Sequence, residues 1–154
     1  IRALLVKQKP LVKQYSSASY LNSLVAGEID LAMTWSGDLF QTARENPDLD
    51  YVIPKEGTYM WVDCLALMRG ARHRQDALRL IDYLLEPEVA ASVANSVRYA
   101  TPNQAAHPLV DKSLRQDPRV YPTPAVMKQL QLHHILDSEQ TELWSQTWAD
   151  VKVA

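Results

Sequence analysis

Hydrophobic positions near the start of this 154-residue chain change from helix-like to strand-like spacing. Residues 19–27 place apolar side chains three and four positions apart, after Ser19 and before Gly27, which predicts a helix with ordinary end signals. Residues 29–35 form a short, mostly apolar run before a Ser-Gly turn signal, which predicts a buried strand. A helix, a tight turn and a strand in this order predict an α/β fold.

The clearest longer strand is predicted at residues 58–68, where the side chains alternate between two faces. The alternation places Trp61 and Asp63 on one face and Cys64 on the other, and we expect Cys64 to be buried. A shorter strand is predicted at residues 51–54. These strands would belong to the same α/β arrangement.

Helical spacing dominates the rest of the chain. Residues 75–85 are amphipathic, and we expect their apolar face, which includes Leu80 and Leu85, to point into the core. Residues 1–14 are ambiguous, because Pro10 interrupts any helix or central strand there. Further helices are predicted at residues 38–45, 87–97 and 125–132, and a last one starts near residue 138.

The composition fits a globular chain with one ordinary core, since 47% of the residues are apolar and the net charge is only -2. We therefore expect one domain or a part of something larger. This charge provides no basic surface for nucleic acid, and no apolar run approaches the roughly 18 residues of a membrane span. The lone Cys64 cannot form an internal disulfide, so cysteine usage leaves the compartment open. Because the chain starts at Ile1 without a signal-peptide pattern, we expect a processed or truncated form.

Two acids and three aromatic residues stand at or beside the ends of predicted elements: Trp35, Asp38, Trp61, Asp63 and Tyr99. A carboxylate held against aromatic faces suits an organic ammonium, because the acid supplies charge while the rings supply quadrupole attraction and shelter from water. We therefore predict a cation-binding cleft rather than a catalytic centre, without a cofactor. The adjacent His133 and His134 have no ligand partner at helical spacing and do not indicate a metal site.

Each of these residues also has an ordinary structural interpretation. Asp38 follows the Ser-Gly turn signal and could cap the helix that starts there, while the three aromatic residues could be core side chains. A carboxylate inside the apolar strand at 58–68 is costly to bury without a partner, so Asp63 favours a ligand role. Two carboxylates flanked by aromatic rings also describe the acid and base of a glycosidase, which is the alternative from another functional class.

Six short segments follow one another along most of residues 19–150. They are AGEIDLAMTWSGD at 26–38, IPKEG at 53–57, WVD at 61–63, YLLEPEV at 83–89, YATPN at 99–103 and VYP at 120–122. This series resembles the periplasmic polyamine-binding proteins of ABC importers, the receptors for putrescine and spermidine. The resemblance implies a two-lobed, type II periplasmic-binding-protein fold, in which α/β lobes joined by crossing strands clamp the ligand.

Proteins of that kind are about twice as long, so the resemblance implies that this chain is the C-terminal half of one. Three parts are then expected. They are a second-lobe α/β segment with the start of the hinge strand at 1–61, a segment returning to the first lobe at 62–107, and C-terminal helices packing on the second lobe at 108–154.

The site residues that the resemblance implies coincide with the acids and aromatic residues singled out above. The family's Trp-x-Gly-Asp motif falls on Trp35 and Asp38, its aromatic-x-Asp motif on Trp61 and Asp63, and its later aromatic residue on Tyr99. Spermidine-type members use a polar residue in a later helix, and the corresponding stretch here is near His133.

The function implied by the resemblance is capture of putrescine or spermidine between two lobes in the periplasm and delivery to an ABC transporter permease. Such a protein is expected to be a monomer at full length and not an enzyme. A ligand-sensing domain of a receptor is a further alternative, because it would share the same kind of site. The choice between the two amines depends on slot length and on residues outside this chain.

Overall fold

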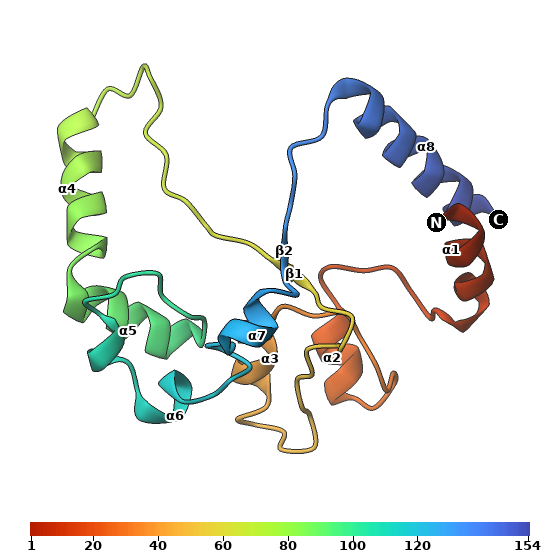
Figure 1. Cartoon of the computed structure of the whole chain (residues 1–154), viewed down its shortest axis with the longest axis horizontal. Coiled ribbons are helices and arrows are strands. Elements are labelled where there is room, and N and C mark those ends of the chain that lie inside the picture. Colours follow the sequence, from red (N-terminus) through yellow and green to blue (C-terminus); the bar gives the residue numbers. More distant parts are fainter. The chain divides into compact units, whose positions relative to one another are not determined.

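The structure, a computed structural model, describes all 154 residues, which divide into two compact units. Unit 1 comprises Ile1–Ala32 together with His133–Ala154, and unit 2 comprises Met33–Leu132. Unit 1 holds α1 (Arg2–Gln8), η1 (Lys9–Leu11), α2 (Tyr20–Val25) and α8 (Ser138–Val153). Unit 2 holds α3 (Ser36–Thr42), β1 (Tyr59–Met60), α4 (Arg74–Leu84), α5 (Pro87–Val97), η2 (His107–Leu109), α6 (Lys112–Arg115), α7 (Pro124–Met127) and β2 (Gln131–Leu132), as Figure 1 shows.

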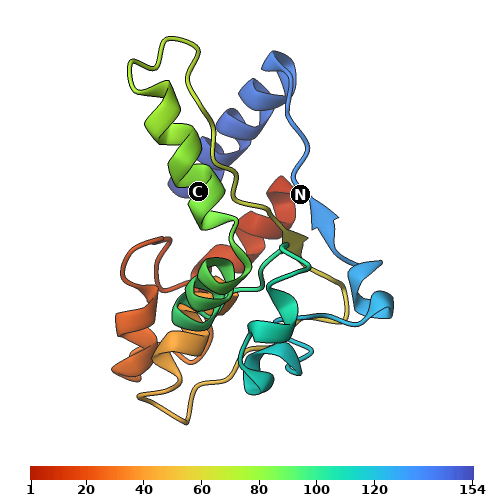
Figure 2. The same ribbon diagram turned by 90° about the vertical axis from the view of Figure 1, so that its left-hand side faces the viewer.

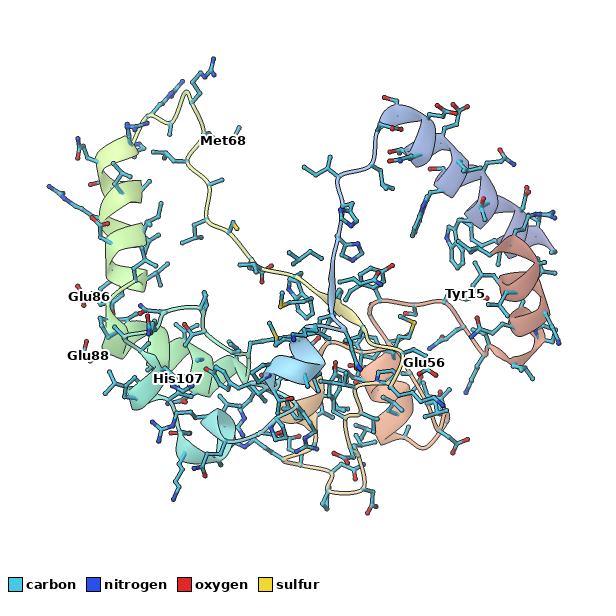
Figure 3. All side chains as sticks on the ribbon, viewed as in Figure 1. Tyr15, Glu56, Met68, Glu86, Glu88 and His107 are labelled. Atoms are coloured by element: carbon cyan, nitrogen blue, oxygen red, sulfur yellow. The ribbon has the colours of Figure 1, made fainter.

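In unit 1, the short helix α1 packs against the long helix α8 (Figure 1). Arg2 Nε donates a hydrogen bond to Asp150 Oδ2 over 2.9 Å, which links the two helices. The ring of Tyr15 meets the ring of Trp148 edge-on, with 4.8 Å between the centroids (Tyr15 is labelled in Figure 3). Helix packing, this hydrogen bond and the ring contact therefore hold the two ends of the chain in one unit.

Most of the predicted helices are confirmed. The helix expected at 19–27 is α2, with Ser19 as its N-cap and Gly27 after it at a φ of 66°, a conformation that glycine adopts without strain. The predicted helices at 75–85 and 87–97 are α4 and α5, and the last helix starts at the expected residue. The ambiguous stretch at the N-terminus forms α1 and η1, with Pro10 inside the first turn of η1, where a missing N–H is tolerated.

The predicted strands are wrong as paired strands, apart from one short piece. β1 pairs in parallel with β2, with Tyr59 opposite Gln131 and Met60 opposite Leu132, and this two-stranded sheet contains every strand of the structure. Residues 29–35 and 51–54 form no ladder, and the run after β1 continues extended towards α4 (Figure 1). An alternating or apolar sequence favours a strand, but a ladder of hydrogen bonds also needs the backbone of a neighbouring strand.

The missing neighbours also change the expected burial. Leu31 and Met33 are 90% and 95% exposed, and Cys64 is exposed rather than buried. The apolar face of α4 is likewise open, since Leu80 and Leu85 are 56% and 60% exposed. These burial expectations are wrong because a strand face or a helix stripe is covered only when another element packs on it, and the contact between α4 and α5 leaves Leu80 and Leu85 open.

The helix predicted at 125–132 is wrong in its second half. Thr123 caps α7 by accepting a hydrogen bond from Val126 N, but the helix ends at Met127. Gln131 then donates its backbone N–H to Thr58 O over 3.0 Å, which starts the pairing of β2 with β1. A long-range backbone pairing therefore overrides the local helical spacing.

The core of unit 2 lies where α5 packs against η2 and α6 (Figures 1 and 2). Ala91 and Ala94 line the buried face of α5, and their small side chains allow the following segment to approach closely. Leu114 is the largest of the fully buried side chains in this core, at 1% exposure. The core includes Ala91, Ala94, Ala106, Val110, Leu114 and Val120, with Phe40, Ala90 and Tyr121 packed against it.

The boundaries of the two units differ from the three expected segments at 1–61, 62–107 and 108–154. Unit 2 contains the whole of 62–107 and parts of the other two segments, and the two ends of the chain share unit 1. A compact unit is a group of residues in contact, whereas the expected segments describe assignment to lobes of a larger protein. The assignment of the three segments to lobes therefore stays a prediction.

Gly57 allows the turn before β1 to approach the segment before β2. Its φ is 88°, and a Cβ there would overlap the carbonyl oxygen of Gln129. We predict that Gly57→Ala lowers the free energy of unfolding by more than about 1 kcal/mol, because the left-handed backbone is strained for alanine even without the overlap. Urea denaturation measures this. Gly70→Ala is the matched control, since no heavy atom lies within 4 Å of its Cβ position, and equal effects of the two substitutions would contradict the prediction.

Candidate ligand-binding site

Trp35 and Asp38 are both positioned by the start of α3. Trp35 is the N-cap residue, with an extended backbone and no capping hydrogen bond from its side chain. Asp38 lies inside the first turn of the helix and is therefore not its N-cap, so the structural alternative raised for this residue is wrong. A carboxylate in the first turn is stabilised by the exposed N–H groups and the positive end of the helix dipole.

Tyr99 reaches Asp38 from a segment far along the chain. Arg98, the C-cap of α5, has a φ of 62°, so the chain turns sharply just before Tyr99. The Tyr99 hydroxyl donates a hydrogen bond to Asp38 Oδ1 over 3.0 Å, and the contact is partly buried. This bond to an ionised group orients the carboxylate.

The three aromatic residues form a continuous series. The ring centroids of Trp35 and Trp61 are 4.5 Å apart at an interplanar angle of 65°, and those of Trp61 and Tyr99 are 5.9 Å apart at 78°. Edge-to-face contacts at these distances are favourable. Trp35 and Trp61 are 50% and 37% exposed, so they are not core side chains.

Asp63 lies two residues beyond Trp61 on the extended run that follows β1. Its side chain lines the same cleft as Trp61 and Tyr99, and it forms no hydrogen bond or ion pair in the structure. The expectation that Asp63 is enclosed in an apolar strand is wrong, because the residue is exposed. Its availability to a ligand therefore follows from its place in the cleft and not from a burial penalty.

The cleft that Trp61, Asp63 and Tyr99 line has a volume of about 530 Å³, whereas Trp35 and Asp38 are not among its lining residues. This volume falls within the range of about 300 to 1,000 Å³ that is usual for small-molecule sites. Aromatic and apolar side chains dominate the lining, and Asp63 and Arg119 are its charged members. The cleft is lined by Ser36, Tyr51, Ile53, Thr58, Tyr59, Met60, Trp61, Val62, Asp63, Tyr99, Ala100, Thr101, Pro102, Arg119, Val120, Tyr121, Pro122, Met127 and Leu130.

Arg119 is paired inside the protein. Its Nε and Nη2 donate to the carboxylate of Asp117, with 2.7 Å between Nη2 and Oδ2, and its Nη1 donates to Asp50. The guanidinium also lies 5.1 Å from the ring centroid of Phe40, within the range of a cation–π contact. Two carboxylates thus balance the positive charge of Arg119, and Asp63 supplies the uncompensated charge of the cleft lining.

The hydrogen bonds from the Arg119 side chain lower the pKa of Asp117 below its usual value. A lowered folded-state pKa stabilises the protein above the unfolded-state pKa of about 4, and this stabilisation is lost as the pH falls through the folded-state pKa. We predict that Asp117→Asn reduces the loss of unfolding free energy between neutral and acidic pH. Urea denaturation at several pH values measures it. Asp82→Asn, which removes the charge of an exposed carboxylate outside the cleft, is the control, and equal effects of the two substitutions would contradict the prediction.

Several lining residues were not among the candidates from the sequence. Arg119, Tyr51 and Tyr59 carry no local signal, because they reach the cleft through contacts between distant segments. Tyr121 belongs to the VYP segment at 120–122, but the residue type alone indicates no role in a site. It packs against the core, its hydroxyl accepts a hydrogen bond from Thr101 N over 3.2 Å, and the His107 ring stands edge-on to it (His107 is labelled in Figure 3).

The remaining candidate, His133, lies in unit 1, whereas the five acidic and aromatic residues all lie in unit 2. No three His, Cys, Asp or Glu side chains are arranged to hold a metal ion. Among the helices, none has the length and apolar character that crossing a membrane requires.

Comparison with known protein families identifies the family of this chain. Residues 1–122 match the family described as bacterial extracellular solute-binding protein. The chain belongs to this family. The solved structure of the spermidine/putrescine ABC transporter substrate-binding protein PotD from Streptococcus pneumoniae matches 99% of this chain and 47% of that one, with a TM-score of 0.85 and 25% identity. The expected α/β class and type II periplasmic-binding-protein fold, of which the chain forms a part, are thus confirmed.

Curated members of the extracellular solute-binding proteins are also similar in sequence. The putrescine-binding periplasmic protein PotF of Escherichia coli is 32% identical over 155 residues, which cover 97% of this chain and 42% of that protein. The spermidine/putrescine-binding periplasmic protein of Escherichia coli is 37% identical over 124 residues, which cover 80% of this chain and 36% of that protein. The chain therefore spans less than half the length of these relatives.

Proposed function

We propose that this chain is part of an extracytoplasmic solute-binding protein that captures putrescine or spermidine and delivers it to an ABC transporter permease. The observation that carries the proposal is the arrangement of Trp61, Tyr99 and Asp63 around one cleft, with Trp35 and Asp38 in contact with these aromatic residues. The names of the similar proteins support it, since each refers to putrescine or spermidine.

The chemistry of a polyamine matches this arrangement. A polyamine is a flexible methylene chain with terminal ammonium groups, and it needs separated anions with an apolar slot between them. Asp63 would accept a charge-assisted hydrogen bond from one ammonium, worth about 1.5 to 3 kcal/mol, while Asp38 holds the same or a neighbouring amine. Trp35 and Trp61 would cover the methylene chain or a charged end, each cation–π contact adding about 0.5 to 2 kcal/mol. Tyr99 forms a wall between these groups.

The charges of the cleft favour a cation over an anion. Arg119 is its one basic lining residue, and Asp117 and Asp50 already pair with it. Asp63 has no partner within the chain. An ammonium can therefore pair with Asp63 without breaking an existing ion pair. An anion would have to compete with two carboxylates for Arg119.

Binding without turnover is part of the proposal. A glycosidase would use the two carboxylates as acid and base, and a sensor domain would share the site but act through attached signalling segments. The relatives are named as binding proteins, which supports the transport function over both alternatives. We also propose a periplasmic location, as two of these names state for the relatives, and a monomer that contacts the permease and no nucleic acid.

Calorimetric titration of the natural full-length protein tests the function. Putrescine and spermidine are titrated separately, with uncharged butanediol as the analogue that keeps the methylene chain but lacks ammonium groups. Saturable heat with at least one amine, without heat from butanediol and without consumption of the amine, is the expected result. A folded, ligand-free protein that binds neither amine contradicts the proposal, and release of a reaction product would favour the hydrolase.

A further inference from the structure

Gly37 lies between the two motif residues Trp35 and Asp38, and the aromatic ring of Tyr99 rests directly against it. A Cβ at Gly37 would overlap Cε2 and Cδ2 of that ring and lie 2.6 Å from Cζ. Gly37 is buried within the helical turn of α3, and its φ lies outside the left-handed region that only glycine adopts easily. The position therefore depends on the absence of a side chain and not on backbone freedom.

The same ring connects Gly37 to the neighbouring carboxylate. The Tyr99 hydroxyl donates to Asp38 Oδ1 over 3.0 Å, while the side of the ring covers Gly37. A phenol ring is rigid, so the place of its hydroxyl is set by where the ring lies. Any displacement of the ring from Gly37 therefore moves the hydroxyl relative to Asp38.

A second contact holds the Tyr99 segment against α3. Gln41, one turn after Gly37, donates from Nε2 to Val97 O over 3.0 Å, and the same atom lies 3.4 Å from Gly37 O. Val97 is the last residue of α5 and precedes Tyr99 by two positions. The backbone before Tyr99 is thus tied to the helix that carries Asp38.

We infer that Gly37 is a positioning residue for the Asp38 carboxylate: it leaves room for the Tyr99 ring, whose hydroxyl orients that carboxylate for a bound ammonium. Gly37 itself does not line the cleft. The inference rests on the proposed polyamine site for its effect on binding, but its structural part stands on the three residues alone. It assigns a purpose to the glycine of the Trp-x-Gly-Asp motif.

A crystal structure of Gly37→Ala tests the structural part without any ligand. The expected result is a displaced Tyr99 ring whose hydroxyl no longer lies within hydrogen-bond distance of Asp38. A variant that keeps this hydrogen bond overturns the inference, whether or not the protein binds a polyamine.

A urea denaturation series covers the case in which Gly37→Ala does not crystallise. Alanine is favoured over glycine inside a helix, so Gly37→Ala alone should raise the midpoint wherever the ring is absent. We expect it to lower the midpoint in the wild-type background and to raise it in the Tyr99→Ala background. The same direction of change in both backgrounds overturns the inference.

Putrescine titrations of the natural full-length protein test the effect on binding. Gly37→Ala should weaken putrescine binding about tenfold, whereas in the Asp38→Asn background the same change should alter it less than about twofold. Gly70→Ala is the control and should leave the affinity unchanged. Equal losses in both backgrounds overturn the inference, because a merely structural effect of Gly37 would not depend on Asp38. Absence of binding by the wild-type protein rejects the proposed function instead, and the crystal structure and denaturation series then decide the inference.

Discussion

Asp63→Asn is expected to weaken binding of putrescine or spermidine at least about tenfold, equivalent to about 1.4 kcal/mol, with little change in stability. The substitution keeps the shape of the side chain and removes the charge that would pair with an ammonium. The fold should tolerate it, because Asp63 is exposed and forms no hydrogen bond or ion pair in the structure. Calorimetric titration of the natural full-length protein gives the affinity, and urea denaturation gives the stability.

Asp82→Asn provides the control for Asp63→Asn. Asp82 is an exposed carboxylate on α4, outside the residues that line the cleft, so its replacement changes the net charge by the same amount. A long-range charge effect would weaken binding in both variants, whereas a direct contact weakens it only in Asp63→Asn. Unchanged affinity in Asp63→Asn would remove Asp63 from the site.

Leu114→Ala is expected to lower the free energy of unfolding by about 2 to 5 kcal/mol. Leu114 is 1% exposed and packs in the cluster that joins α5 to η2 and α6. Truncation removes buried methyl groups and leaves a cavity, because the small side chains of Ala94 and Ala106 on the facing elements cannot expand to fill it. Urea denaturation measures the loss, and an unchanged dependence on urea concentration would show that the variant unfolds from the same compact state.

Leu109→Ala is the matched control for this core substitution. Leu109 lies five positions before Leu114 at the end of η2, but its side chain is 49% exposed. We expect its truncation to lower the free energy of unfolding by less than about 1 kcal/mol. Comparable losses of unfolding free energy in the two variants would contradict the assignment of Leu114 to the core, since burial is what distinguishes the two leucines.

The core and the cleft are physically connected, which gives the stability prediction a functional consequence. Val120 belongs to the buried cluster and also lines the cleft, and Tyr121 packs against that cluster while facing the same cleft. Ala94 lies on the α5 turn that precedes Arg98 and Tyr99. We expect the core beneath Val120 and Tyr121 to hold this part of the cleft in place, which would limit the entropy lost when the proposed ligand binds.

The helices show where sequence reasoning succeeds. The 75–85 and 87–97 patterns identified α4 and α5, because helical hydrogen bonds run within the segment and Pro87 marks the start of α5. The predicted helix at 125–132 failed for the opposite reason. Its last residues form β2, whose partner β1 lies about seventy positions earlier in the chain, and no local pattern specifies such a pairing.

Part of the candidate site could likewise be predicted from the sequence, and part could not. Its acids and aromatic residues were recognisable from residue type and motif, and the structure brings Trp35, Trp61 and Tyr99 into contact. The hydrogen bond between Tyr99 and Asp38 crosses 61 sequence positions, so only the folded chain could reveal it. The expected burial of Asp63 is wrong, because its exposure depends on the absence of neighbouring strands and not on its own alternating pattern.

The amino-acid sequence by itself determined the positions of the main helices, the α/β class and the two motifs that supply acids and aromatic rings, because these depend on local spacing and side-chain chemistry. The tertiary structure decided which residues face one another. It paired Arg119 with Asp50, placed the Tyr99 ring on Gly37, and left the apolar face of α4 open. These outcomes depend on contacts between segments that are distant in the chain, and burial and pairing energies are set by such contacts rather than by the residues alone.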